Sequence, residues 1–237
     1  MAADRRLALV VGASGGIGRA LADALVERGA HDEVVALSRT APTGWAGRHM
    51  LLDLTDEAGV AAAAELVRDV GAADTVFIAS GILHDGAVQP EKSYRVLDPI
   101  ALQRLFAVNT TGPALVAKHF LPLMPRGRRS VFAALSARVG SIGDNRLGGW
   151  YGYRASKAAL NMMIKSLAIE HRRTHPQAVL AALHPGTVAT DLSAPFAGAR
   201  EVLTPARSAD ALLSVLDGLT PDDTGGFFAW DGERVLW

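Results

Sequence analysis

Short apolar runs alternate along this chain with longer stretches in which apolar residues recur at helical spacing. The short runs predict seven strands, at residues 7–11, 33–37, 49–52, 75–79, 129–135, 179–184 and 226–229. The longer stretches predict helices at 16–28, 57–69, 100–121, 151–173 and 205–216. This alternation is typical of βαβ units, and near-continuous apolar strands indicate a sheet covered on both faces. We therefore expect one Rossmann-type, doubly wound parallel α/β domain over residues 1–237.

Composition and charge exclude several classes of function. Lys plus Arg equals Asp plus Glu at 24 each, and no basic run with interleaved aromatics favours nucleic acid. No apolar run is long enough to span a bilayer, and the one at 7–11 is too short for a secretory signal. The absence of cysteine removes disulfides and thiolate metal sites. From these features together we expect no association with a membrane and a cytoplasmic location. His171 and His175 are four residues apart but precede Pro176 in a basic helix end, and no metal site is expected.

A glycine-rich turn joins the first predicted strand to the first predicted helix. It reads Gly12-Ala13-Ser14-Gly15-Gly16-Ile17-Gly18. Backbone amides at a helix N-terminus can face a pyrophosphate where no side chain intervenes. The turn therefore predicts a dinucleotide phosphate site at Gly12, Ser14, Gly15, Gly16, Ile17 and Gly18. The alternative is a tight turn that needs glycine for steric reasons alone.

The residues after the second and third strands bear on cofactor choice. Ser38 and Arg39 stand where a site for an unphosphorylated ribose usually has a carboxylate. Arg39 can pair with a 2′-phosphate through its planar guanidinium, so NADP(H) is expected over NAD(H); the alternative is a solvated surface charge. Asp53, followed by Leu54, can accept a hydrogen bond from the adenine amino group, or it can cap the helix that begins near Asp56.

Tyr153 and Lys157 lie four residues apart near the start of a predicted helix, which puts phenol and ammonium on one face. A nearby cation lowers the pKa of a phenol from about 10 toward the neutral range, where it can act as an acid and base. The pair follows the strand that ends before Ser136 and precedes the Pro185-Gly186 turn. Since ligands of open α/β sheets bind beyond the carboxyl ends of strands, these segments can converge at one edge.

In this order, G-x-x-x-G-x-G, Asn109-Thr110-Thr111-Gly112, the serine, Y-x-x-x-K and P-G-x-x-x-T strongly resemble the short-chain dehydrogenase/reductase family. The resemblance covers nearly the whole chain. Residues 136–142, 148–154 and 225–232, with the terminal Trp237, resemble the branch that contains bacterial C-factor and sniffer-type carbonyl reductases.

The resemblance implies a role for each motif. Tyr153 is the implied proton donor in reduction, and Lys157 lowers its pKa and holds the nicotinamide ribose. Asn109 is implied to anchor a water in the proton relay. Thr190 and the backbone around Val188 are implied to hold the carboxamide, and Ser136 to donate to the substrate oxygen. Further residues expected at the cofactor are Ala79, Ser80, Gly81, Asn109, Pro185 and Gly186.

Two departures from the family pattern bear on these roles. In the family's S-x-x-G, counting back from Gly140 puts Ala137 in the serine position, one residue after Ser136. Since successive strand residues point to opposite faces, Ser136, the reserve candidate Ser141 and a purely structural role for Ser136 all stay open. The family's N-N-A-G is Ile78-Ala79-Ser80-Gly81 here, which keeps the glycine that allows close backbone approach.

The first hypothesis for function is an NADPH-dependent oxidoreductase acting on a small carbonyl or alcohol substrate, with a substrate loop at 190–206. A second is a C-factor-like signalling or regulatory protein that binds the dinucleotide with little or no turnover, which the displaced serine favours. A third is a scaffold without a dinucleotide. The resemblance also implies a homodimer or homotetramer that pairs the helices at 100–121 and 151–173.

Overall fold

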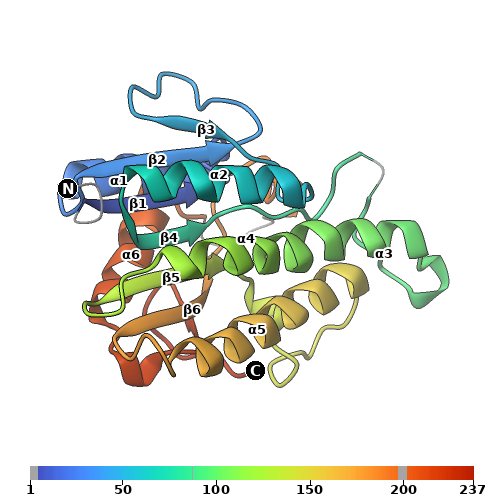
Figure 1. Ribbon diagram of the computed structural model, residues 1–237. Coiled ribbons are helices and arrows are strands. Elements are labelled where there is room, and N and C mark those ends of the chain that lie inside the picture. The colour runs from blue at the N-terminus through green and yellow to red at the C-terminus, as the bar shows by residue number, and fades with distance from the viewer. Residues whose placement is uncertain (1–4, 87, 197–201) are drawn as a thin grey trace.

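A seven-stranded parallel sheet forms the centre of the computed structural model, which describes residues 5–86, 88–196 and 202–237 (Figure 1). Its order is β3-β2-β1-β4-β5-β6-β7, so the chain reverses direction of growth between β1 and β4. The strands are β1 Arg6–Val11, β2 Glu33–Ser38, β3 His49–Leu51, β4 Ala72–Ile78, β5 Ser130–Leu135, β6 Ala178–His184 and β7 Gly226–Ala229. All seven predicted strands are confirmed, and the doubly wound fold places a ligand crevice at the reversal point.

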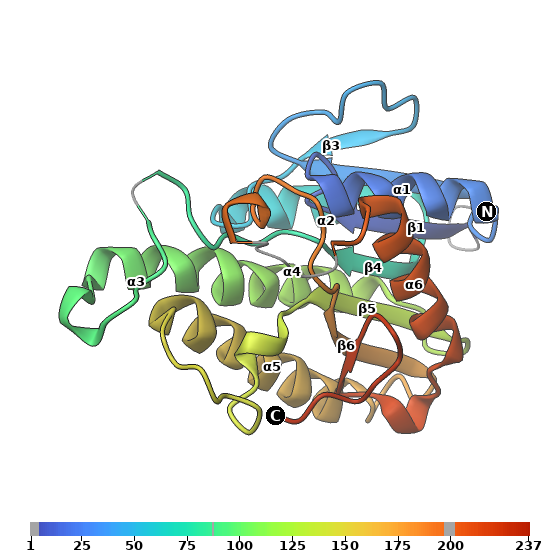
Figure 2. The same ribbon diagram turned by 180° about the vertical axis from the view of Figure 1, so that it is seen from behind.

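Helices cover both faces of the sheet, as its apolar strands require. α1 (Gly16–Arg28) and α6 (Pro205–Gly218) pack together on one face (Figure 2). α2 (Glu57–Val70), α4 (Gly112–Phe120) and α5 (Tyr151–His171) cover the other. Alternate residues of β1 feed the two cores, with Leu9 in the core under α2 and α4 and Val10 in the core under α1.

The single helix predicted at 100–121 is wrong in one respect, because it is interrupted. α3 (Pro99–Phe106) passes through a π-helical turn at Ala107–Thr111 into α4. The Gly112 amide donates to Ala107 O, five residues back, and Pro113 has no N–H to continue the α-helical ladder. The apolar periodicity is almost unchanged by this bulge, so the pattern alone gives one long helix.

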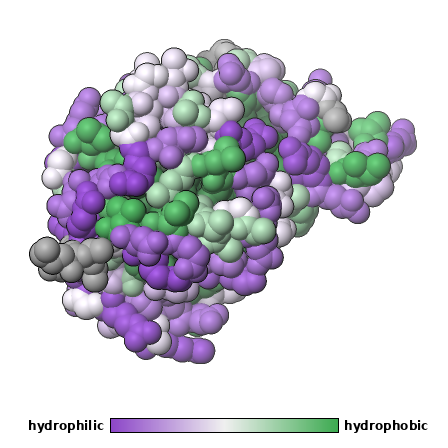
Figure 3. Space-filling model, turned by 45° about the horizontal axis from the view of Figure 1, so that its top comes forward, coloured by the Kyte–Doolittle hydropathy of each residue, from purple (hydrophilic) through white to green (hydrophobic). Residues whose placement is uncertain are grey.

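α3 belongs to a lobe that projects from the body of the protein (Figures 1 and 3). Val96, Leu97 and Ile100 are exposed there, and hydrophobic residues are visible on the lobe in Figure 3. Within the residues that the structure describes, no helix is both long and apolar enough to cross a membrane.

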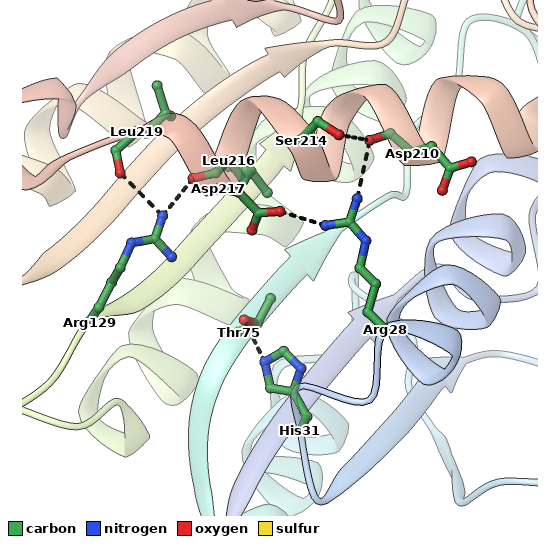
Figure 4. Close-up of polar contacts among 9 residues, drawn as sticks. All are labelled: Arg28, His31, Thr75, Arg129, Asp210, Ser214, Leu216, Asp217 and Leu219. Carbon is green, nitrogen blue, oxygen red and sulfur yellow. Dashed lines mark hydrogen bonds and ion pairs between the residues drawn. The ribbon is translucent and has the colours of Figure 1, made fainter.

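Two arginines near the amino ends of the strands bind residues of α6 and of the turn that follows it (Figure 4). Arg129, just before β5, donates to the carbonyls of Leu216 and Leu219, at the carboxyl end of α6. Arg28, at the end of α1, pairs with Asp217 at 2.7 Å. A cation near the last carbonyls of a helix is favourable because these carbonyls lack helical donors. These contacts fix α1 and α6 and leave the opposite, carboxyl edge for the site.

Candidate active site

In the glycine turn at the carboxyl end of β1, Gly12 and Gly18 have no room for a side chain. Gly12 has φ +86°, and a Cβ on it would lie 2.4 Å from Ser80 Oγ. A Cβ on Gly18 would lie 2.2 Å from the carbonyl oxygen of Gly12. Gly15 is the N-cap of α1 and has no side chain to cap the helix. The N–H groups of the first helical turn are therefore available to a ligand.

A cavity of about 200 Å³ lies beside this turn and extends to the ends of β2 and β3. Arg39 lines it and is exposed. Ser38 lines it too, but its hydroxyl donates to Thr40 O at 2.7 Å. Leu52 and Leu54 supply an apolar wall. The residues expected at the adenosine end therefore line one cavity. Arg39 and Arg104 are the two cationic residues in its lining, and Arg104 pairs with Asp85 at 3.1 Å.

Asp53 is held in the turn before α2. Its Oδ1 accepts from the amide of Thr55 at 2.8 Å and from the Thr55 hydroxyl at 2.7 Å. These hydrogen bonds lower the pKa of the Asp53 carboxyl, so it is ionised at neutral pH. The helix cap is Asp56, which accepts from the amide of Ala58. Asp53 is thus not the cap, and it lines the same cavity as Arg39.

A second cavity of about 280 Å³ continues from the first toward α5. The two share Gly15, Ala79, Ser80 and Gly81. The second is also lined by residues from three other segments expected at the site, namely Ser136, Tyr153 with Lys157, and Pro185 with Thr190. A continuous groove with a glycine cradle at its centre fits an extended dinucleotide, with the phosphates at the glycine turn and the nicotinamide toward Tyr153.

Tyr153 and Lys157 come from one face of α5 and are both buried. Lys157 Nζ lies 5.8 Å from the centre of the Tyr153 ring and donates to Leu135 O at 2.8 Å. Burial lowers the pKa of Lys157 to about 8, and burial raises the pKa of Tyr153. Without a cofactor, desolvation therefore outweighs the expected lowering of the phenol pKa by Lys157.

Asn109 sits in the π-helical turn and is fully buried. Its Oδ1 accepts from the amide of Ile82 and its Nδ2 donates to the carbonyl of Ile82, both at 2.8 Å. Nδ2 also donates to Ser156 Oγ. The backbone carbonyl of Asn109 loses its usual α-helical donor, because the residue four positions on is Pro113. The side chain therefore fixes the loop after β4, while the main-chain carbonyl has no amide donor four residues on.

Gly81 brings this loop against α5. A Cβ on Gly81 would lie 3.1 Å from Lys157 Nζ and 3.3 Å from Asn109 Oδ1. A side chain at this position would force Lys157 or Asn109 to shift, so glycine here allows the close approach that the sequence predicted.

The hydroxyls of the serine segment are engaged within the protein. Ser136 is buried and donates to Asn161 Oδ1 on α5 at 2.6 Å. Ser141 is also buried and accepts from the amide of Asp144 at 3.0 Å. Ala137 is the residue of this segment that lines the neighbouring substrate cavity. The bond to Asn161 matches the structural role that the sequence left open for Ser136.

The segment after β6 reaches the site through its backbone. Gly186 has φ +81°, and Val188 is buried in an isolated bridge with Leu203. The Thr190 hydroxyl lies 3.4 Å from the carbonyl oxygen of Val188. The expected substrate loop at 190–206 includes residues 197–201, which lie outside the described part of the chain. Its described part contains a short helix at Ala194–Phe196.

A third cavity, of about 470 Å³, adjoins the groove at Tyr153 and Leu192. Its walls are largely apolar, with Leu83, Val139, Trp150 and Phe196 among them. Trp150 and Phe196 meet edge to face, with ring centres 5.2 Å apart. The space beside Tyr153 therefore suits a substrate with an apolar body.

Sequence reasoning missed two residues of this cavity. Arg154 donates to the carbonyls of Gly149 and Val139 and so holds the loop before α5. His184, the last residue of β6, lines the cavity together with Ala137 and Tyr153. Its place directly before Pro185, at the carboxyl end of a strand, is the signal that could have found it.

No group of three or more His, Asp or Glu side chains among the described residues could hold a metal ion. His171 and His175 stack on each other with ring centres 3.9 Å apart. Burial lowers the pKa of both rings, so they are neutral at pH 7. The expected cationic helix end therefore comes from the neighbouring arginines and not from these histidines.

Comparison with known proteins adds two kinds of finding. The family model for short chain dehydrogenases matches residues 6–200. A curated relative, 1-hydroxy-2-glutathionyl-2-methyl-3-butene dehydrogenase of Rhodococcus sp. (strain AD45), is 34% identical over 232 residues, which are 97% of this chain and 98% of the relative. C-signal of Myxococcus xanthus is 38% identical over 141 residues, which are 60% of this chain and 81% of C-signal.

Solved structures of similar fold include carbonyl reductases. The NADPH-bound carbonyl reductase from chicken fatty liver superposes with a TM-score of 0.84 at 26% identity, covering 100% of this chain and 96% of that one. The carbonyl reductase Sniffer of D. melanogaster superposes with a TM-score of 0.85 at 23% identity, covering 99% and 100%. The second likeness concerns the fold alone.

Proposed function

The chain belongs to the short-chain dehydrogenase family and is an NAD(P)-dependent oxidoreductase, and we propose that it uses NADP(H) to interconvert a carbonyl compound and an alcohol. One observation carries the proposal: Tyr153, Lys157 and the glycine turn line the same cavity, and Tyr153 also lines the apolar cavity next to it. The phenol is thereby at the boundary between a dinucleotide groove and a substrate pocket.

In this proposal the bound nicotinamide supplies or accepts the hydride, and the chain's own residues handle the proton. Tyr153 gives its proton to the substrate oxygen during reduction, since burial raises its pKa and keeps the free phenol protonated. Lys157 is mostly protonated at pH 7, and an ammonium has three N–H donors. One donates to Leu135 O, which leaves two for the ribose and the proton relay.

Asn109 serves the relay through its main chain. Its side chain is engaged by Ile82 and Ser156, whereas its carbonyl has no amide donor four residues on, where Pro113 stands, and in this proposal it holds the water. Gly186, Val188 and Thr190 hold the carboxamide in the same proposal.

A Tyr153→Phe substitution tests these roles. We expect kcat to fall by about 10²–10⁴-fold, because a positioned general acid contributes that much, while the affinity for NADPH stays within about threefold. Turnover is measured as NADPH consumption with aldehydes, ketones and quinones, and affinity by thermal shift. Tyr151→Phe is the matched control, since Tyr151 lies two residues earlier on the same helix and lines neither cavity. Substantial turnover by Tyr153→Phe would contradict the assignment.

A second candidate is a regulatory protein that binds the dinucleotide with little turnover. The similarity to C-signal and the alanine at position 137 favour it. The same experiment separates the two candidates, because NADPH binding without consumption of any carbonyl substrate supports the regulatory role.

A further inference from the structure

The wall beside Tyr153 has an alanine where the family has a serine, so a hydroxyl that could hydrogen-bond the substrate oxygen is missing there. Ala137 lines the substrate cavity, whereas the hydroxyl of Ser136 donates to Asn161. A carbonyl oxygen gains negative charge during hydride transfer, and a fixed donor lowers the barrier by stabilising that charge. Tyr153 is one donor, and the position of the second is open.

His184 stands next to this position in the sheet. The last paired residues of β5 and β6 are Leu135 and Leu183, and the amide of Ser136 donates to the carbonyl of Leu183 at 2.7 Å. The ladder therefore sets His184 beside Ser136 and Ala137. His184 lines the same cavity of about 470 Å³ as Ala137 and Tyr153.

The two ring nitrogens of His184 differ in their surroundings. Nδ1 is buried with no hydrogen-bond partner among the described residues. A buried bare acceptor is tolerated more readily than an orphaned N–H, so the proton of a neutral ring belongs on Nε2. Nε2 is not among the buried, unpartnered side-chain atoms of the described residues, and His184 lines the cavity, so Nε2 is the ring nitrogen that can reach a ligand there.

The ring is neutral across the pH range in which the chain would work. Burial is the main cause that lowers the pKa of His184 to about 4, and Arg138 adds to this while Asp231 opposes it. Arg146, Arg154 and Asp144 are the other charged residues that line the cavity. A neutral Nε2–H can donate to the substrate oxygen without competing with Tyr153 as the proton source.

We propose that His184 is a further catalytic residue, whose Nε2–H donates a hydrogen bond to the substrate oxygen and replaces the hydroxyl missing at Ala137. The inference rests on the proposed function. No proton leaves the imidazole: the hydride goes to the carbonyl carbon, Tyr153 supplies the proton, and His184 stabilises the oxygen as charge develops.

Three substitutions test which atom acts. His184→Leu removes both nitrogens, and we expect kcat to fall by about 10²–10³-fold, the usual cost of one such donor, with KM and NADPH affinity within about threefold. His184→Gln places an amide near Nε2 and should keep activity within about tenfold of the wild type. His184→Asn places its amide near Nδ1 and should behave like His184→Leu. The Gln and Asn pair has matched polarity and controls for folding.

A restoration experiment gives the sharper readout. Adding Ala137→Ser to His184→Leu returns a hydroxyl to the position that the family uses, and we expect at least a tenfold recovery of kcat. The wild-type rate should also show no titration of His184 between pH 5 and pH 8. A kcat of His184→Leu within threefold of wild type overturns the inference, as does equal activity of the Gln and Asn variants.

Failure of this inference is distinguishable from failure of the proposed function. If the wild type consumes NADPH, Tyr153→Phe does not, and His184→Leu is unimpaired, only the inference fails. Thr187 lines the same cavity, and a larger loss for Thr187→Val than for His184→Leu would assign the donor to Thr187 and overturn the inference. If Tyr153→Phe keeps its turnover, the proposed function itself fails.

Discussion

In the proposed function, the choice of NADP(H) over NAD(H) depends on Arg39. Arg39 is exposed just after β2 and lines the part of the groove that we expect to hold the adenosine. Asp53, the carboxylate predicted for this end, lines the same cavity. An ion pair with a 2′-phosphate would add to NADPH binding alone, because NADH has no charge at that oxygen. The proposed preference for NADP(H) therefore rests on Arg39, because Arg104, the other arginine of this cavity, pairs with Asp85.

An Arg39→Ala substitution should weaken NADPH binding by about 10–100-fold, the usual worth of a hydrogen bond to a charged group. Binding of NADH should change by less than about threefold. Dissociation constants from cofactor fluorescence at fixed salt measure both. Arg48→Ala is the control, because Arg48 is exposed nearby but pairs with Glu33. Equal weakening of the two cofactors would refute the role of Arg39.

At the scale of elements, the π-helical turn between α3 and α4 holds the loop after β4 in place beside the candidate site. The side chain of Asn109 in this turn hydrogen-bonds both the amide and the carbonyl of Ile82. These two bonds hold the loop after β4 against the helix. The joint sets Gly81 against Lys157.

An Asn109→Leu substitution should lower the free energy of unfolding by about 2–5 kcal/mol, because it leaves two buried backbone groups of Ile82 unpaired. Urea unfolding measures the change. Thr111→Ala, at an exposed residue of the same turn, should stay within about 0.5 kcal/mol of wild type. A loss for Asn109→Leu no larger than that of the control would show that the joint is not needed for stability.

The sequence predicted the elements well because their signals are local. The seven strands and the faces of the helices follow from apolar runs and periodicity. Tyr153 and Lys157 could be placed on one face from their spacing alone. The π-helical turn was missed, although Pro113 inside the predicted helix is a warning that the backbone ladder breaks there.

Burial and side-chain partners could not be predicted in the same way. The sequence suggested that Lys157 lowers the pKa of Tyr153, whereas burial of the phenol decides the direction in the free chain. The partner of Ser136 is Asn161, 25 residues away on another element, and no local pattern encodes that contact. His184 reads from sequence as an ordinary strand end.

At the scale of the whole molecule, buried histidines make stability depend on pH. Burial is the first cause that lowers the pKa of His171 and of His184 to about 4, against about 6.5 in an unfolded chain. Between these values the unfolded chain binds protons that the folded chain does not. The stabilisation is therefore complete above about pH 6.5 and is lost as the pH falls toward 4.

Each of these histidines should give a slope of at most about 1.4 kcal/mol per pH unit. Urea unfolding at pH 7 and pH 5 measures the combined effect. In a His171→Leu variant the drop between the two pH values should shrink by about 2 kcal/mol, because one proton fewer is taken up on unfolding. An unchanged drop would contradict the role of His171.

The expected pairing of subunits through α4 and α5 stays a prediction. Met162 and Ile169 on α5 are 65% and 56% exposed in the single chain, so apolar area is present on that helix.

The strand order has a consequence for how the protein is made. Each new strand is added beside an outer strand of the sheet already present: β2 and β3 on one side of β1, then β4, β5, β6 and β7 on the other. No strand has to be inserted between two that are already joined. A chain leaving the ribosome from its amino end can thus extend its sheet in the order of synthesis, without separating strands that have already paired.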